Sequence, residues 1–126
     1  MDSSPNIIPT ERDLTEQERQ LLGWLLDHAE SDSSLYSAQL IDARVVSVCG
    51  CGCPTIDLGI RGAPAPKSGS SILADYYGMS PEDLLVGVIV HARDGFLSEL
   101  EVYDVKGEAK GPFSLPTLDS LTLTPT

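Results

Sequence analysis

Residues 86–105 read VGVIVHARDGFLSELEVYDV and carry the clearest structural signal in the chain. Apolar and polar residues alternate on both sides of a central Asp-Gly pair, as is typical of a β-hairpin with one dry face. A two-residue Asp-Gly turn would place Val90 opposite Glu99 and mix apolar with charged side chains. A three-residue loop, with Gly95 in the left-handed conformation, pairs Val90 with Ser98 and keeps one face apolar. We therefore expect the three-residue loop.

A second antiparallel hairpin is expected nearer the N-terminus. Val46 and Val48 share one face of residues 44–48, and the apolar side chains of residues 55–61 alternate with polar ones in the same way. Such alternation predicts two paired strands with one dry and one wet side. The following residues 62–72 are rich in Pro, Gly and Ser, which indicates a mobile connector between the hairpins.

An amphipathic helix precedes these strands. Residues 15–18, TEQE, form a capping box, in which the Thr15 hydroxyl accepts from the Glu18 N–H and the Glu18 carboxylate accepts from the Thr15 N–H. The leucines that follow recur at helical spacing and define one apolar stripe, which consists of Leu21, Leu22, Leu25 and Leu26. The helix is expected to end in the turn formers of residues 30–34, and a shorter helical segment to follow over residues 35–40.

These segments predict a single α+β domain over residues 14–107. Its N-terminal amphipathic helix packs on an antiparallel sheet of about four strands, arranged as two hairpins. Residues 1–13 contain two prolines and are interpreted as a flexible N-terminal arm. Residues 108–126 contain three more and are interpreted as an irregular, Pro-rich C-terminal tail.

Composition excludes several classes of function. The 126 residues include 8 Lys and Arg against 19 Asp and Glu, which gives a net charge of −11 and a pI of about 4.3. So acidic a chain lacks the positive surface that binds nucleic acids and anionic membranes. The longest apolar run, over 84–90, has seven residues, whereas a membrane span needs roughly 20. These two features lead us to expect a protein that binds neither nucleic acid nor membrane. Because no signal-peptide pattern follows Met1, we also expect the protein to be cytoplasmic.

The most unusual string is CGCGCP, residues 49–54, whose thiols belong to Cys49, Cys51 and Cys53. Three thiols can ligate Zn²⁺ or another soft metal. Alternate side chains of an extended strand lie about 6.6 Å apart, so a common ion requires the glycines to fold the segment back. The sequence has no second Cys pair, so a fourth ligand would come from His28, His91, Asp57 or water. The alternative interpretation is a Gly-rich turn with three reduced thiols.

His91 is expected near Glu99 and Glu101 in the later hairpin. A histidine–carboxylate pair can act as a general base, but it is also a common cross-strand pair at a surface. The sequence shows no nucleophile or oxyanion donor beside it, so we expect a protein without catalytic residues. Tyr76 and Tyr77 either belong to a binding surface, where tyrosine is enriched, or pack onto the core.

Three motifs resemble those of a group of small bacterial proteins classed as domains of unknown function. They are LTEQER at residues 14–19, CGCPT at residues 51–55 and DGFLSELEVY at residues 94–103. With the intervening strands they cover roughly residues 13–107. The resemblance implies a compact bacterial α+β domain and brings no activity, cofactor or catalytic residue with it.

The combined features favour a non-enzymatic binding module of regulatory or immunity type, whose acidic surface is complementary to a basic protein partner. The expected partner-binding residues are Tyr76, Tyr77, Glu99, Glu101 and Tyr103. An alternative function is that of a metal- or thiol-dependent protein that uses the cysteine string, with zinc as the expected ion and His91 as a candidate further ligand. A third hypothesis is a homodimer formed through the outer face of the later hairpin, around Ile89, Leu97 and Tyr103.

Overall fold

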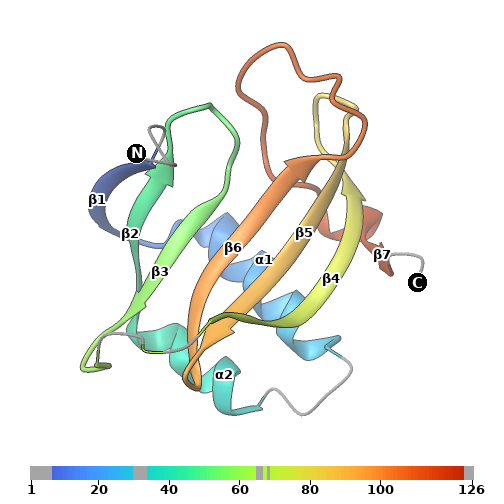
Figure 1. Ribbon diagram of the computed structural model, residues 1–126. Coiled ribbons are helices and arrows are strands. Elements are labelled where there is room, and N and C mark those ends of the chain that lie inside the picture. Colours follow the sequence, from blue (N-terminus) through green and yellow to red (C-terminus); the bar gives the residue numbers. More distant parts are fainter. Residues whose placement is uncertain (1–6, 30–33, 65–66, 68, 124–126) are drawn as a thin grey trace.

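The computed structural model describes residues 7–29, 34–64, 67 and 69–123, which form one antiparallel sheet and two helices (Figure 1). In chain order the elements are β1 (Ile7–Asp13), α1 (Glu16–Asp27), α2 (Ser34–Gln39), the 3₁₀ turn η1 (Leu40–Asp42), β2 (Ala43–Cys49), β3 (Ile56–Ile60), β4 (Ser71–Met79), β5 (Leu85–Arg93), β6 (Phe96–Asp104), the 3₁₀ turn η2 (Leu118–Ser120) and β7 (Thr122–Leu123). The seven strands are ordered β1-β2-β3-β6-β5-β4-β7. The α+β fold is confirmed, with more strands than the four predicted.

Helix α1 begins as the sequence predicts. The Thr15 hydroxyl accepts from the Glu18 N–H at 3.1 Å, and the Glu18 carboxylate accepts from the Thr15 N–H at 2.9 Å. The four leucines of the stripe are buried in one core cluster with the inward side chains of the sheet. The predicted short helix is confirmed as α2, whereas residues 30–33 of the expected turn lie outside the described part of the chain.

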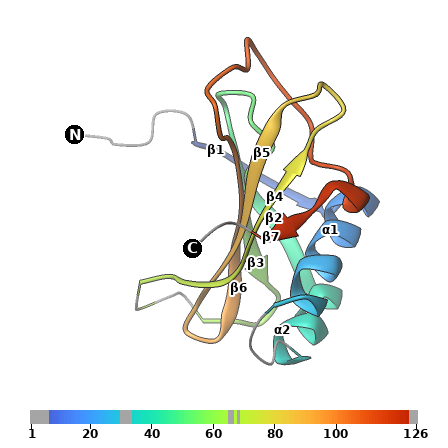
Figure 2. The same ribbon diagram turned by 90° about the vertical axis from the view of Figure 1, so that its right-hand side faces the viewer.

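Both helices lie on the same side of the sheet (Figure 2). Among the described residues, no helix or strand packs on the opposite face, which we call the outer face. Of the described helices, none is long and apolar enough to cross a membrane.

Strand β1 corrects the interpretation of residues 1–13 as a flexible arm. Residues 7–13 pair with β2 at the edge of the sheet, with Pro9 opposite Ser47. Proline is tolerated in such a strand because one of its sides makes no ladder hydrogen bonds. Residues 1–6 of the expected arm lie outside the described part of the chain.

Strands β4 and β7 lie where the sequence predicts a connector and an irregular tail. Strand β4 begins at Ser71, inside the 62–72 segment, and pairs with β5 along its length. Strand β7 pairs with β4 on its other side, and Leu115 of the same tail is buried. Residues 65, 66, 68 and 124–126 of these two segments are not among those described.

A two-residue turn connects β5 and β6. Asp94 and Gly95 have φ angles of 54° and 85°, and two successive positive values are those of a type I′ turn. Val90 consequently pairs with Leu100, whereas the three-residue loop would pair it with Ser98. The predicted register is therefore wrong by two residues, a shift that leaves the same face of the hairpin in the core.

A bulge in β6 reconciles this short turn with one dry face. Leu97 pairs with Ala92 but Glu99 pairs with His91, so Ser98 is an extra residue in the ladder. Leu97 points into the core, where it is buried, and its predicted position on the outer face is wrong. Glu99 and His91 remain together on the outer face.

Strand β2 carries a similar irregularity. The pairing with β3 shifts by one residue between Val45 and Ser47, so Val46 is extra. Val45 is buried, Val46 is 39% exposed, and Val48 packs against the core. The predicted dry face shared by Val46 and Val48 is wrong because the bulge inverts the alternation between them.

Candidate functional site on the outer face of the sheet

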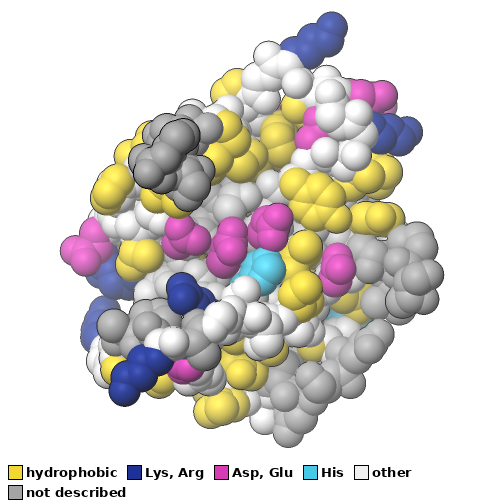
Figure 3. Space-filling view, in the orientation of Figure 1, with side chains coloured by type: hydrophobic (Ala, Val, Ile, Leu, Met, Phe, Trp, Pro, Cys, Tyr) yellow, Lys and Arg dark blue, Asp and Glu magenta, His cyan; other side chains and the backbone are white. Residues whose placement is uncertain are grey.

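Acidic side chains from three strands meet in the middle of the outer face. Asp57 of β3 pairs with Glu99 of β6, which in turn pairs with His91 of β5. In the next row, Glu101 of β6 and Asp75 of β4 lie on either side of one β5 residue. Figure 3 looks onto this surface and shows acidic side chains beside a histidine over the middle of the sheet. We call the surface formed by Asp57, Asp75, His91, Glu99 and Glu101 the acidic face.

His91 lies at the centre of the acidic face. Its Nε2 is 2.8 Å from Glu101 Oε1 and 4.0 Å from Glu99 Oε1, so the expected proximity of these residues is confirmed. The side chain is 13% exposed, and its Nδ1 has no hydrogen-bond partner within the described ranges. The nearest ligand atoms of all three residues lie within 4.8 Å of one another.

Burial and like charge act against the ionised form of Glu99. Burial raises the pKa of this carboxyl, the charge of protonated His91 lowers it, and the charges of Asp57 and Glu101 raise it again, so that the pKa lies above its ordinary value. Ser47 holds Asp57 in this group by donating a hydrogen bond to its carboxylate from the neighbouring strand. Ionisable groups that are held together against repulsion are more frequent at functional sites than elsewhere.

We expect Glu99→Gln to stabilise the protein at neutral pH by up to about 1 kcal/mol. Because the pKa of Glu99 is raised in the folded state, the ionised carboxylate destabilises the fold above that pKa, and the penalty disappears as the pH falls through it. The gain should therefore vanish in acid below about pH 4, where the carboxyl is protonated in both states. Urea unfolding at several pH values measures the effect. A variant that is less stable than the wild type at neutral pH would contradict it.

Two tyrosines border the acidic face. Tyr77 of β4 and Tyr103 of β6 pair with Gly87 from opposite sides, and a Cβ added to this glycine would lie only 2.3 Å from the Tyr103 ring. The absence of a side chain at Gly87 thus leaves the space that the Tyr103 ring occupies. Tyr76 points the other way and is 6% exposed, and its hydroxyl donates to the His28 carbonyl at 2.7 Å. Tyr76 is therefore a core residue, and its predicted place on a partner-binding surface is wrong.

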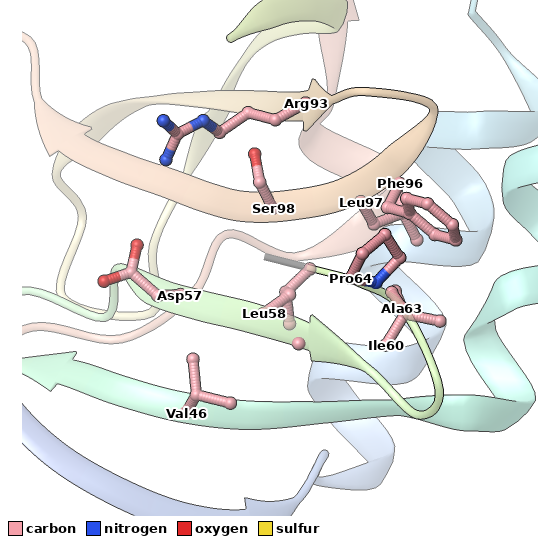
Figure 4. A pocket seen from close by; sticks show the side chains of 11 residues that line it. Val46, Asp57, Leu58, Ile60, Ala63, Pro64, Arg93, Phe96, Leu97 and Ser98 are labelled. Atoms are coloured by element: carbon pink, nitrogen blue, oxygen red, sulfur yellow. The ribbon is translucent and has the colours of Figure 1, made fainter. Parts of the chain in front are cut away.

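A cavity of about 390 Å³ opens beside the acidic face. It forms because β3 pairs with β6 at Ile56 and Asp57 and the two strands then diverge. Figure 4 shows polar and charged side chains at one end of the cavity and apolar ones at the other. The polar end has Asp57, Arg93 and Ser98, and the apolar end has Ile60, Pro64 and Phe96. A lining of this kind suits a long side chain with an apolar stem and a polar tip.

The three cysteines lie together in the turn between β2 and β3. Their Sγ atoms are all within 4.8 Å of one another, and those of Cys49 and Cys51 are 2.8 Å apart. All three are free thiols, and together they could hold a metal ion. The candidate fourth ligands His28, His91 and Asp57 do not belong to this group, and His91 belongs instead to the cluster with Glu99 and Glu101.

The chain matches no protein-family model, no curated protein and no solved structure. The resemblance to small bacterial proteins therefore stays a prediction from three motifs, and function has to be inferred from the acidic face and the cysteine turn.

Proposed function

We propose that the protein is a binding module whose acidic face receives a basic segment of a partner protein. The observation that carries this proposal is the position of four carboxylates around one histidine in the middle of an uncovered sheet face. These carboxylates come from three different strands, so the folded sheet brings them together. A partner of opposite charge is the ligand to which such a surface is complementary.

A cationic side chain would relieve the repulsion that the acidic face contains. The ionised form of Glu99 is disfavoured by burial and by the charges of Asp57 and Glu101. A lysine or arginine placed among these residues would form charge-assisted hydrogen bonds and stabilise all three charged forms. Relief of repulsion on binding contributes to affinity without requiring a large interface.

The border of the acidic face supplies apolar contacts for such a segment. Ile72 pairs with His91 and is 58% exposed, and the rings of Tyr77 and Tyr103 lie at the other end of the face. Tyrosine is enriched among the residues that dominate binding energy at interfaces. The apolar stems of lysine and arginine can pack on this border while their charged ends reach the carboxylates.

A second copy of the chain is a poorer partner than a basic protein. Two acidic faces in contact would bring carboxylates opposite carboxylates, which costs several kcal/mol. Leu97, one of the three residues expected at a homodimer contact, is buried in the core. The net charge of −11 instead accelerates encounter with basic partners. A regulatory or immunity-type protein that covers a basic surface would act in this way.

The proposal is tested by the binding of a fluorescent lysine-rich peptide, measured by anisotropy. We expect the double variant Glu99→Gln/Glu101→Gln to weaken binding by about tenfold, or ~1.4 kcal/mol. The matched control is Glu16→Gln/Glu108→Gln, which removes the same charge from two exposed positions away from the acidic face. This control should change the affinity for the peptide by less than about twofold. Added salt should weaken peptide binding by the wild type more than peptide binding by Glu99→Gln/Glu101→Gln.

Equal losses in the two double variants would contradict the proposal. Such a result would mean that the peptide responds to the overall negative charge and that the acidic face has no special affinity. Unfolding curves of both variants, recorded in the same buffer, show whether a loss of binding accompanies a loss of structure.

A further inference from the structure

The cysteine turn has no role in the proposed function, yet its geometry is that of a ligand set. Cys49 ends β2, and the chain then folds back so that all three Sγ atoms lie within 4.8 Å of one another. On an extended strand, neighbouring thiols of this spacing would be about 6.6 Å apart. Sulfurs bonded to one ion at about 2.3 Å lie roughly 4 Å from each other. Small side-chain rotations therefore bring the thiols into contact with a common ion.

The fold-back depends on Gly52 and on the C-terminal segment. Gly52 has a φ of +100°, a region that favours glycine, and the Cys53 N–H donates to Cys51 Sγ at 3.3 Å. A Cβ added to Gly52 would lie 3.1 Å from Pro112, and the Gly52 carbonyl accepts from the Phe113 N–H at 3.4 Å. The turn is thus held in shape by a segment some 60 residues away in the chain, as an organised ligand site requires.

We propose that Cys49, Cys51 and Cys53 bind one thiophilic d¹⁰ cation, Zn²⁺ or Cu⁺, through their three sulfurs. Thiolates select such ions over Mg²⁺ and Ca²⁺, which prefer oxygen ligands. No His, Asp or Glu of the described residues joins the three thiols. Zn²⁺ would therefore complete its four-coordinate shell with water, and Cu⁺ would be satisfied by the three sulfurs alone. The exposure of Cys51 makes the ion accessible from solvent, unlike the ion of a closed structural site.

Exposure and hydrogen bonding suit the thiols to the capture of an ion at the surface. Cys51 is exposed, and its Sγ accepts from the Cys49 thiol and from the Cys53 N–H, so it lies at the centre of the three sulfurs. An incoming ion therefore meets Cys51 first. The thiols release their protons to solvent as their sulfurs bind the ion, so affinity should rise with pH.

The test is an anaerobic titration of the reduced, metal-free chain with Cu⁺ and, separately, with Cd²⁺ as a spectroscopic substitute for Zn²⁺. We expect sulfur-to-metal charge-transfer absorbance that saturates at one ion per chain, with all three thiols then protected from a thiol reagent. Loss of one ligand in Cys51→Ser should weaken binding by more than about a hundredfold. Gly52→Ala keeps every thiol but strains the turn, and it should also weaken binding. His91→Ala is the matched control and should leave the titration unchanged.

Absence of the charge-transfer band with both ions would overturn the proposal, as would an undiminished affinity in Cys51→Ser. Weaker binding in His91→Ala would assign the ion to the cluster with Glu99 and Glu101 and overturn it as well. Saturation by either ion at one per chain supports the proposal, and circular dichroism confirms that each variant is folded. The Lys-rich peptide should bind Cys51→Ser as tightly as the wild type, so failure of the metal site and failure of the acidic face are distinguishable.

Discussion

We expect Leu25→Ala to lower the free energy of unfolding by about 2–5 kcal/mol. Leu25 is fully buried in the stripe of α1 that faces the sheet, so its truncation removes apolar contacts and leaves a cavity. A domain of this size has roughly 5–15 kcal/mol of stability in total, so the loss is a large fraction of it. Urea denaturation followed by circular dichroism measures the change.

Leu35→Ala is the matched control for this substitution. Leu35 belongs to α2 but is 65% exposed, so the same change of side chain should cost less than about 0.5 kcal/mol. Similar losses in the two variants would contradict the described packing of α1, because they would mean that both leucines contribute to stability only through helix propensity.

We expect Glu18→Ala to destabilise the protein by about 2–3 kcal/mol. The Glu18 carboxylate forms a two-point ion pair with Arg12, at 2.9 Å for each contact, and also accepts from the Thr15 N–H. It thereby joins β1 to the first turn of α1. The comparison variant is Glu16→Ala, which removes an exposed acid from the same turn and should cost less than about 1 kcal/mol.

The loss of stability caused by Glu18→Ala should depend on pH. Burial alone would raise the pKa of Glu18, but the hydrogen bonds from Arg12 and Thr15 outweigh it and hold the pKa below its ordinary value. A lowered folded-state pKa means that the carboxylate stabilises the protein above about pH 4 and that this contribution is lost as the pH falls through the lowered value. If the difference in free energy of unfolding between wild type and Glu18→Ala persisted unchanged in strong acid, the stabilising role of the ionised Glu18 carboxylate would be contradicted.

The elements that the sequence predicts well are those whose signals are local. The capping box at Thr15 and Glu18 and the leucine stripe behind it lie within one helix, and the alternation around Asp94 and Gly95 lies within one hairpin. Strand β1 contains Pro9, and in β4 the buried Ala74 and Tyr76 alternate with a mixture of apolar, acidic and aromatic residues, so neither strand has a strong pattern of its own. Their strand conformation comes from pairing with β2 and β5, which a local pattern does not encode.

The hairpin register shows how two local rules can combine. Turn chemistry favours a two-residue Asp-Gly turn, whereas burial favours a register that keeps one face of the hairpin apolar. The two preferences conflict if the strands are regular, because Val90 would then pair with Glu99. The bulge at Ser98 satisfies both, because Leu97 stays opposite Ala92 in the core while Glu99 moves to a position opposite His91 on the outer face. A bulge adds one unpaired residue without a distinctive sequence signature, so regular alternation predicted the wrong register.

The candidate sites were predictable to different extents. His91, Glu99 and Glu101 lie in one hairpin, and their proximity follows from it. Asp57 and Asp75 join them because β3 and β4 flank that hairpin in the sheet, an order that requires the whole topology. The cysteine string was evident from spacing alone, but the contact of its thiols depends on the backbone conformation at Gly52.

The central claim is that a basic segment binds at the acidic face, and NMR titration of the ¹⁵N-labelled protein with the lysine-rich peptide tests it most directly. We predict the largest amide shifts on β3, β4, β5 and β6 at Asp57, Asp75, His91, Glu99 and Glu101, with Tyr77 and Tyr103 affected at the border. Shifts on α1 and α2, on the opposite side of the sheet, should be small. Shifts spread evenly over all acidic residues, or concentrated on the helices, would contradict the account.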